Sequence, residues 1–139
     1  MSHNHVAVVV AVLAAFAIGF GLYSIPPISE IFMRGWGLDP ETLEPRPGPF
    51  VVSIVGTFLG AYAISWLIGR LGIASGAGGA RLGLLLSFAL MAPVIVTHEM
   101  FGGVGSGAIA VDVANTILSG TVMGWILGAW RPARGDVSR

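Results

Sequence analysis

Residues 108–130 read AIAVDVANTILSGTVMGWILGAW, an apolar stretch of 23 residues in which Asp112 is the only charge. A helix needs about 20 predominantly apolar residues to cross the hydrocarbon core of a bilayer. Because lipid offers no hydrogen-bond partner to the backbone, a helix is the form that such a segment takes there. The stretch therefore predicts a membrane-spanning helix that carries one ionisable side chain.

Three further stretches of similar character precede this one. They cover residues 6–23, 50–69 and 82–101, and the last of them contains His98 and Glu99 near its end. Hydrophobic residues make up 55% of the 139-residue chain and charged residues 10%, whereas a soluble domain carries roughly 25% charged residues. The mean hydropathy is +0.85. The sequence thus predicts an all-α integral membrane protein, a single domain folded as a four-helix bundle within the lipid bilayer.

The amino-acid inventory excludes several kinds of chemistry. Cysteine and lysine are absent, which removes disulfides, thiolate metal sites, thiol nucleophiles and Schiff-base cofactors. The net charge is zero and no basic run occurs, so we expect no nucleic-acid partner. No serine accompanies an evident base and orienting group, so we expect a protein without enzymatic activity.

The arginines predict an orientation in the membrane. Five of the seven lie in the second connection and the C-terminal tail, which share a side with the N-terminus in a four-span topology. The positive-inside rule then places both termini in the cytoplasm, and the expected location is a bacterial inner membrane. The first connection faces the opposite, extracytoplasmic side. Within it, residues 28–36 carry apolar side chains at helical spacing, which predicts a short interfacial helix.

Short motifs near the ends of the spans resemble a known family. They are Gly21-Leu22-Tyr23-Ser24, Phe32-Met33-Arg34, Gly37-Leu38, Met123-Gly124-Trp125-Ile126-Leu127-Gly128 and Trp130-Arg131. With the pattern around Asn115, they make the chain similar along nearly its whole length to the small bacterial membrane proteins of domain-of-unknown-function family 1761. The resemblance implies a four-helix membrane fold. It implies no chemistry, because the family has no established activity.

A polar stripe runs along the last span. At about 100° per residue, one helix face carries Asp112, Asn115, Thr116 and Ser119. Ionisable residues within a membrane usually face protein or water and are functional candidates. Two interpretations remain open. Asp112 is either a structural acid at the helix N-terminus, or part of a lined cavity or ion site.

His98 and Glu99 are expected on the same side of the membrane as Asp112. Together the three side chains could bind a divalent metal ion or pass a proton, but they come from different helices and we expect no metal. His98 could also ligate a haem or pigment, although His3 and His5 lie on the opposite side, about 30 Å away. We prefer the simpler interpretation, in which these are interfacial polar residues without a cofactor.

Small residues recur at every fourth position in three of the spans. The ridges are Gly120, Gly124 and Gly128 in the last span, Gly56 and Gly60 in the second, and Ala11, Ala15 and Gly19 in the first. Such ridges let helix backbones approach closely in lipid, either within one chain or between subunits.

Two functional hypotheses follow. The abundance of small residues favours a non-enzymatic protein that packs with other transmembrane helices, as an oligomer or as an accessory or structural subunit of a larger membrane complex. The alternative is a small transporter or channel for a proton or small solute that uses Asp112 and Asn115.

Overall fold

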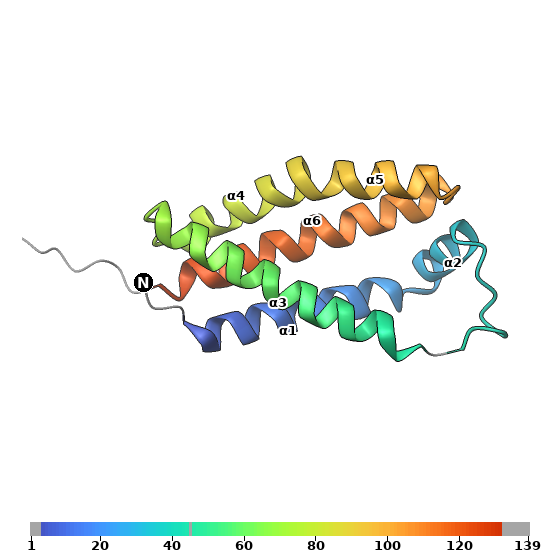
Figure 1. Cartoon of the computed structure of the whole chain (residues 1–139), viewed down its shortest axis with the longest axis horizontal. Coiled ribbons are helices and arrows are strands. Elements are labelled where there is room, and N and C mark those ends of the chain that lie inside the picture. The colour runs from blue at the N-terminus through green and yellow to red at the C-terminus, as the bar shows by residue number, and fades with distance from the viewer. Residues whose placement is uncertain (1–3, 45, 132–139) are drawn as a thin grey trace, which may run out of the picture.

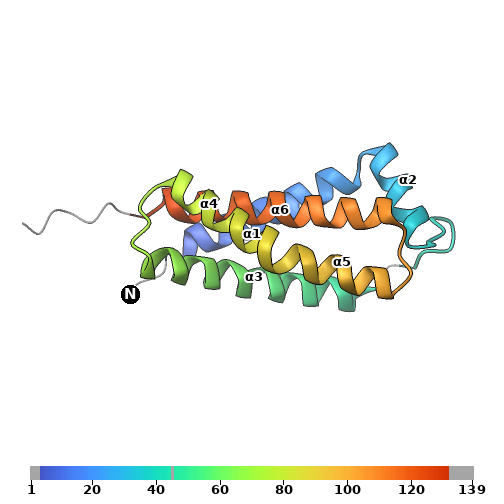
Figure 2. The same cartoon turned by 90° about the horizontal axis from the view of Figure 1, so that it is seen from above.

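The computed structural model describes residues 4–44 and 46–131 as a helical bundle. Four helical runs in this part of the chain are long and apolar enough to cross a membrane. They lie side by side, with a short helix at one end (Figures 1 and 2). The predicted all-α, four-span fold is confirmed. The elements are α1 (His5–Tyr23), α2 (Pro26–Gly35), α3 (Pro47–Arg70), α4 (Gly76–Leu86), the π-helical turn η1 (Ser87–Met91), α5 (Ala92–Phe101) and α6 (Ser106–Ala129).

The two ends of the bundle are different. At one end, here called the terminal end, α1 begins, α3 ends, α4 begins and α6 ends (Figure 1). Arginine side chains are anchored there: Arg131 donates a hydrogen bond to the Ser65 carbonyl oxygen at 2.9 Å, and the Arg70 guanidinium lies 5.4 Å from the ring centre of Trp66. The opposite end, here called the α2 end, holds α2 and the loop between α5 and α6.

The apolar core lies toward the terminal end. Small and branched side chains of α1 pack against α3 and α6, and the side chains of α1 that point the other way, such as Val9 and Leu13, are exposed. An exposed apolar face is what a membrane-spanning helix presents to lipid. The buried core residues are Ala7, Val8, Ala11, Val12, Ala61, Ile64, Ile68 and Leu127.

The third span is longer than the sequence predicts. It is one continuous helical run from Gly76 to Phe101, whereas the predicted span begins at residue 82. The predicted span begins after Arg81 because a charge is expected to mark its boundary. Arg81 is instead an exposed residue of α4, and its long side chain can extend toward headgroups from within a helix. Ser75 caps the helix by accepting a hydrogen bond from the Gly78 N–H at 3.1 Å.

The π-helical turn η1 lies in the middle of this span. Pro93 follows it closely, and a proline both lacks an N–H and clashes with the carbonyl group four residues before it. In η1 the Ala92 N–H bonds to the Ser87 carbonyl oxygen, five residues back. A turn of this kind holds one extra residue, so it rotates the helix face presented by everything that follows.

This rotation determines which polar residue of the third span is buried. In a regular α-helix, His98 would lie about 20° around the axis from Ser87, and Glu99 about 120°. In the structure the buried positions continue instead from Ser87 to Ala92 and Glu99, and His98 is exposed. The π-turn therefore brings Glu99, and not His98, to the face that packs against α6.

Glycines let α4 and α6 pack backbone to backbone. A Cβ atom added at Gly79 would overlap the Gly124 carbonyl oxygen, and one at Gly83 would overlap the Gly120 carbonyl oxygen. Gly128 is packed in the same way against the start of α4. The ridge predicted on the last span is thus used within the chain.

The second glycine ridge has no such neighbour. A Cβ atom added at Gly56 or Gly60 would meet no atom within 4 Å. This half of α3 exposes Val52, Val55 and Leu59, so its surface is open and apolar.

Helix α2 packs on the start of α6. Pro26 and Pro27 begin it, as is common for the first turn of a helix. At its other end the Gly105 N–H donates to the Gly35 carbonyl oxygen at 2.9 Å, and a Cβ added to Gly35 would lie 2.5 Å from the Cβ of Ala108. A short helix is therefore present in the predicted segment, over Pro26–Gly35 where the sequence predicted 28–36, and it packs closely on the bundle.

Candidate functional site

Asp112 lies near the α2 end, in the second turn of α6. Its carboxylate accepts a hydrogen bond from the Tyr23 hydroxyl on one oxygen and, at 3.4 Å, from the indole Nε1 of Trp36 on the other. Tyr23 is the last residue of α1, and Trp36 immediately follows α2. Three separate elements therefore meet at this one carboxylate.

The interpretation of Asp112 as an acid at the helix N-terminus is wrong. Gly105 is the N-cap residue of α6, and the first turn contains no acidic residue. Asp112 lies six residues beyond Ser106, about 9 Å along the helix axis. Its oxygens are directed to side chains of other elements, which is the arrangement of a tertiary polar contact.

Glu99 lies beside Asp112. The side chain is buried, with 8% of its surface exposed, and its carboxyl group lies close enough to that of Asp112 for the two groups to interact. Its Oε2 atom is buried and has no hydrogen-bond partner. We call Glu99 and Asp112 the carboxyl pair. It contains the one buried unpartnered side-chain oxygen or nitrogen in the described part of the chain.

Amide and hydroxyl groups continue the site along α6. The Asn115 side chain lies near the Tyr23 hydroxyl, and the Ser119 hydroxyl donates to Asn115 Oδ1 at 3.4 Å. Gly19 of α1 leaves room for the Asn115 amide, because a Cβ there would lie 3.6 Å from Oδ1. Thr116, the fourth residue of the predicted stripe, is partly buried.

Aromatic rings cover the site on the side of α2. The rings of Tyr23 and Phe32 meet edge to face with 4.8 Å between their centres, and the Phe32 and Trp36 ring centres are 6.3 Å apart. Such contacts stabilise the placement of both hydrogen-bond donors to Asp112. We call Tyr23, Trp36, Glu99, Asp112 and Asn115 the polar cluster.

His98 does not join the polar cluster. It is exposed and lines an open groove of about 440 Å³ with Pro93, Val94, Thr97 and Phe101. Among the described residues, no three His, Asp or Glu side chains converge as metal ligands. A metal site built from His98, Glu99 and Asp112 would need all three, and the structure brings only the two acids together.

The pigment hypothesis has no second histidine near His98. His5 lies at the terminal end, where its Nδ1 is 2.9 Å from the Tyr62 hydroxyl oxygen, and His3 lies outside the described residues. A haem held by two histidines is therefore not supported by the described part of the chain.

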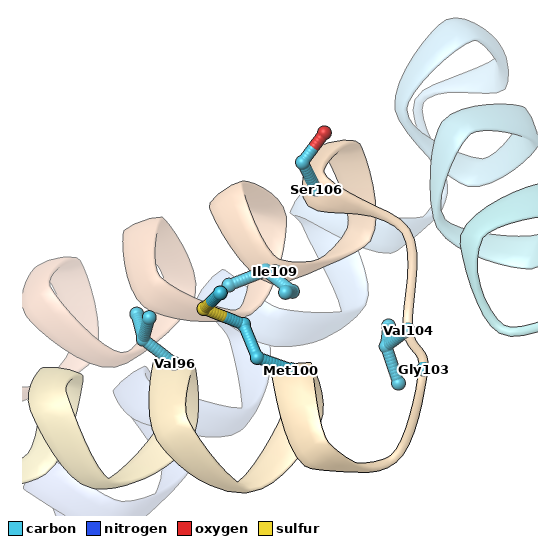
Figure 3. Close-up of a pocket in the computed structure, with 6 residues that line it drawn as sticks. All are labelled: Val96, Met100, Gly103, Val104, Ser106 and Ile109. Carbon is cyan, nitrogen blue, oxygen red and sulfur yellow. The ribbon is translucent and has the colours of Figure 1, made fainter.

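An apolar groove of about 400 Å³ lies between α5 and α6 near the α2 end. In Figure 3 the side chains of Val96, Met100 and Ile109 approach one another across it, whereas the Ser106 hydroxyl points away. None of the polar cluster lines this groove. Its apolar character and open shape fit contact with lipid chains.

Sequence reasoning found three members of the polar cluster and missed the two donors. Asp112, Glu99 and Asn115 were expected as site residues, but Tyr23 and Trp36 were not. The available signal was their chemistry: both are apolar rings with one polar group that can donate a hydrogen bond, and both lie where the first connection meets the bundle.

A family model described as "Protein of unknown function (DUF1761)" matches residues 6–128. No curated protein and no solved structure matches the chain. The matched region includes every residue of the polar cluster and reaches into all four spans. The resemblance found in the sequence is therefore confirmed.

Proposed function

Because the chain belongs to the DUF1761 family, whose description gives no function, we propose one from its own residues: it is a small membrane transporter or channel. Its working site is the polar cluster, and its solute is a proton or a small polar molecule. The observation that supports this most directly is the buried Glu99 side chain, whose Oε2 atom has no partner.

The energetics of the carboxyl pair support a functional role. A buried carboxylate that lacks hydrogen bonds costs several kcal/mol, and replacing buried charged groups by well-packed apolar residues is often neutral or stabilising. A protein that needed only helix packing at this place would be served better by leucine or alanine. Acids kept within a membrane despite this cost are functional candidates by default.

The experiment is a flux measurement in proteoliposomes. Proton entry is followed with a pH-sensitive dye trapped inside the vesicles, under a potential set by potassium and valinomycin; glycerol and urea entry are followed by stopped-flow light scattering. We expect a flux of at least one probe above that of empty vesicles, and loss of that flux in Asp112→Asn.

The matched control is Glu30→Gln, which removes an exposed acid of α2. It leaves the flux of the unmodified protein in place. Equal flux in Asp112→Asn, Glu30→Gln and the unmodified protein would show that the polar cluster does not carry the solute.

The second candidate function is that of an oligomer or an accessory subunit of a larger membrane complex. Its support comes from α3, because the ridge on α6 is occupied by α4, whereas the surface around Gly56 and Gly60 is open. If a second chain packs there, Gly60→Leu lowers the particle mass measured by light scattering in mild detergent. Gly21→Leu changes an equally open glycine of α1 and is expected to leave that mass unchanged.

Location and orientation complete the proposal. The arginine distribution supports a bacterial inner membrane with both termini in the cytoplasm. In that orientation the α2 end, and with it the polar cluster, faces the extracytoplasmic side. We also propose that the protein has no enzymatic activity and no resident cofactor; the absence of cysteine and lysine from the sequence supports this, since it removes thiol nucleophiles and Schiff-base cofactors.

A further inference from the structure

We infer that the carboxyl pair binds one exchangeable proton and that this proton resides on Glu99, with the Asp112 carboxylate as the acceptor of its hydrogen bond. The inference deepens the proposed function and rests on it for the use of the proton in transport. It assigns different roles to two acids that the sequence does not distinguish.

The hydrogen bonds around Asp112 fit an ionised carboxylate. Such a group only accepts hydrogen bonds, and it has lone pairs on both oxygens. One oxygen receives the Tyr23 hydroxyl and the other the Trp36 indole N–H. Both partners are donors toward Asp112, so a proton on Asp112 would weaken it as an acceptor of these two hydrogen bonds.

The surroundings of Glu99 fit a protonated carboxyl group. An ionised Glu99 would need donors on its oxygens, but Oε2 has none. A protonated carboxyl has one hydrogen to donate, and the Asp112 carboxyl group lies within reach to accept it. Proton donation from Glu99 to Asp112 removes the charge of the buried Glu99 group, and its unpartnered Oε2 atom then belongs to a neutral carboxyl group, which costs less to bury than a carboxylate.

Charge independently requires one proton on the pair. The titratable groups that act on Glu99 and its neighbours are Asp112 from α6 and Tyr23 from α1. Helix α2 packs over the site with aromatic rings, while its Glu30 and Arg34 are exposed. Two adjacent carboxylates without a counter-ion strongly disfavour double ionisation. One proton removes that repulsion and needs no additional ligands.

The position of Glu99 indicates the side from which the proton comes. Glu99 is two residues from the end of its span, whereas the start of that span at Gly76 is about 35 Å away at 1.5 Å per residue. Residues 82–97 of the span include no ionisable side chain. The proton therefore exchanges with water at the α2 end.

Infrared spectroscopy of the protein in lipid tests the assignment. The carbonyl stretch of a protonated carboxyl group lies apart from the amide and carboxylate bands and shifts in heavy water. At neutral pH we expect one such band from within the bundle, absent in Glu99→Gln. Glu30→Gln, the exposed control, retains it.

Isotope labelling gives the same test without any substitution, so it stands even if a variant fails to fold. The band should move to lower frequency when the protein is made with ¹³C-carboxyl glutamate and stay in place with ¹³C-carboxyl aspartate. A band that moves only with labelled aspartate, or the absence of a band at neutral pH, would overturn the assignment.

The two proposals fail separately. A glutamate band in a protein that shows no flux supports the proton on Glu99 and refutes transport. Flux that Asp112→Asn abolishes, in a protein without the band, supports transport and refutes the proton on Glu99.

Discussion

The contact between α4 and α6 can be tested by adding a single methyl group at Gly124. A Cβ atom there would overlap the Gly79 carbonyl oxygen and lie 3.2 Å from the Gly83 Cα. Both neighbours are backbone atoms, so neither can rotate away, and the two helices must separate. A gap of about 0.5–1 Å already removes a quarter to a half of the attraction between the atoms concerned.

The size of the effect follows from two opposing contributions. Overpacking of a close contact costs about 1–3 kcal/mol, and alanine is favoured over glycine in a helix by up to about 1 kcal/mol. We expect Gly124→Ala to lower the free energy of unfolding by about 1–2 kcal/mol. Gly56→Ala, with no atom within 4 Å of the new Cβ, should leave it unchanged or raise it.

The measurement is unfolding in mixed detergent micelles with increasing dodecyl sulfate, followed by far-ultraviolet circular dichroism. The two variants add the same atoms to glycines in membrane-spanning helices and differ in their surroundings. Equal free energies of unfolding for Gly124→Ala and Gly56→Ala would contradict the backbone contact. A lower value for Gly56→Ala alone would place the important glycine face on α3.

Three further predictions concern the α2 end and the orientation. Tyr23→Phe removes a donor to a charged group and should lower the free energy of unfolding by about 1.5–3 kcal/mol. Tyr62→Phe, at an exposed contact with a histidine, should lower it by about 0.5–1.5 kcal/mol. Equal losses would contradict a special role of the partly buried contact between Tyr23 and Asp112. Gly35→Leu should separate α2 from the start of α6 and speed hydrogen exchange of the backbone amides in residues 26–35. Unchanged exchange would show that the contact between α2 and α6 tolerates a side chain at this position. Because the chain has no cysteine, Glu41→Cys and Ala74→Cys each introduce a single thiol that reports on its side of the membrane. A membrane-impermeant maleimide added to intact cells should label the Glu41→Cys variant alone. Labelling of the Ala74→Cys variant alone would show that the orientation is the reverse of the predicted one.

The spans were predictable because hydropathy acts on each helix separately. A run of apolar residues long enough to cross a bilayer must become a helix there, whatever its neighbours are. The start of the third span was misplaced because Arg81 was treated as a boundary, although an exposed arginine can reach the headgroups from inside a helix. Helix length is thus set by capping at Ser75, and not by the first charge.

Which helices pack against each other was harder to predict than where the helices lie in the sequence. The ridge of Gly120 and Gly124 was evident from its spacing, but spacing alone does not say which helix covers it. The complementary ridge, Gly79 and Gly83 followed by Ser87, has the same interval, and it lay partly in a segment that the sequence reading treated as a loop. Once α4 is extended to Gly76, the two ridges match.

The choice between His98 and Glu99 shows why local periodicity could not identify the whole site. Adjacent residues on a helix point about 100° apart, so only one of them can face α6. Regular periodicity from Ser87 would select His98, which would favour a histidine-based metal or pigment site. The π-turn ahead of Pro93 adds one residue and selects Glu99, which places an acid beside an acid. The chemistry proposed for this protein therefore depends on one turn of irregular backbone, located about two helical turns away from the residue that it positions.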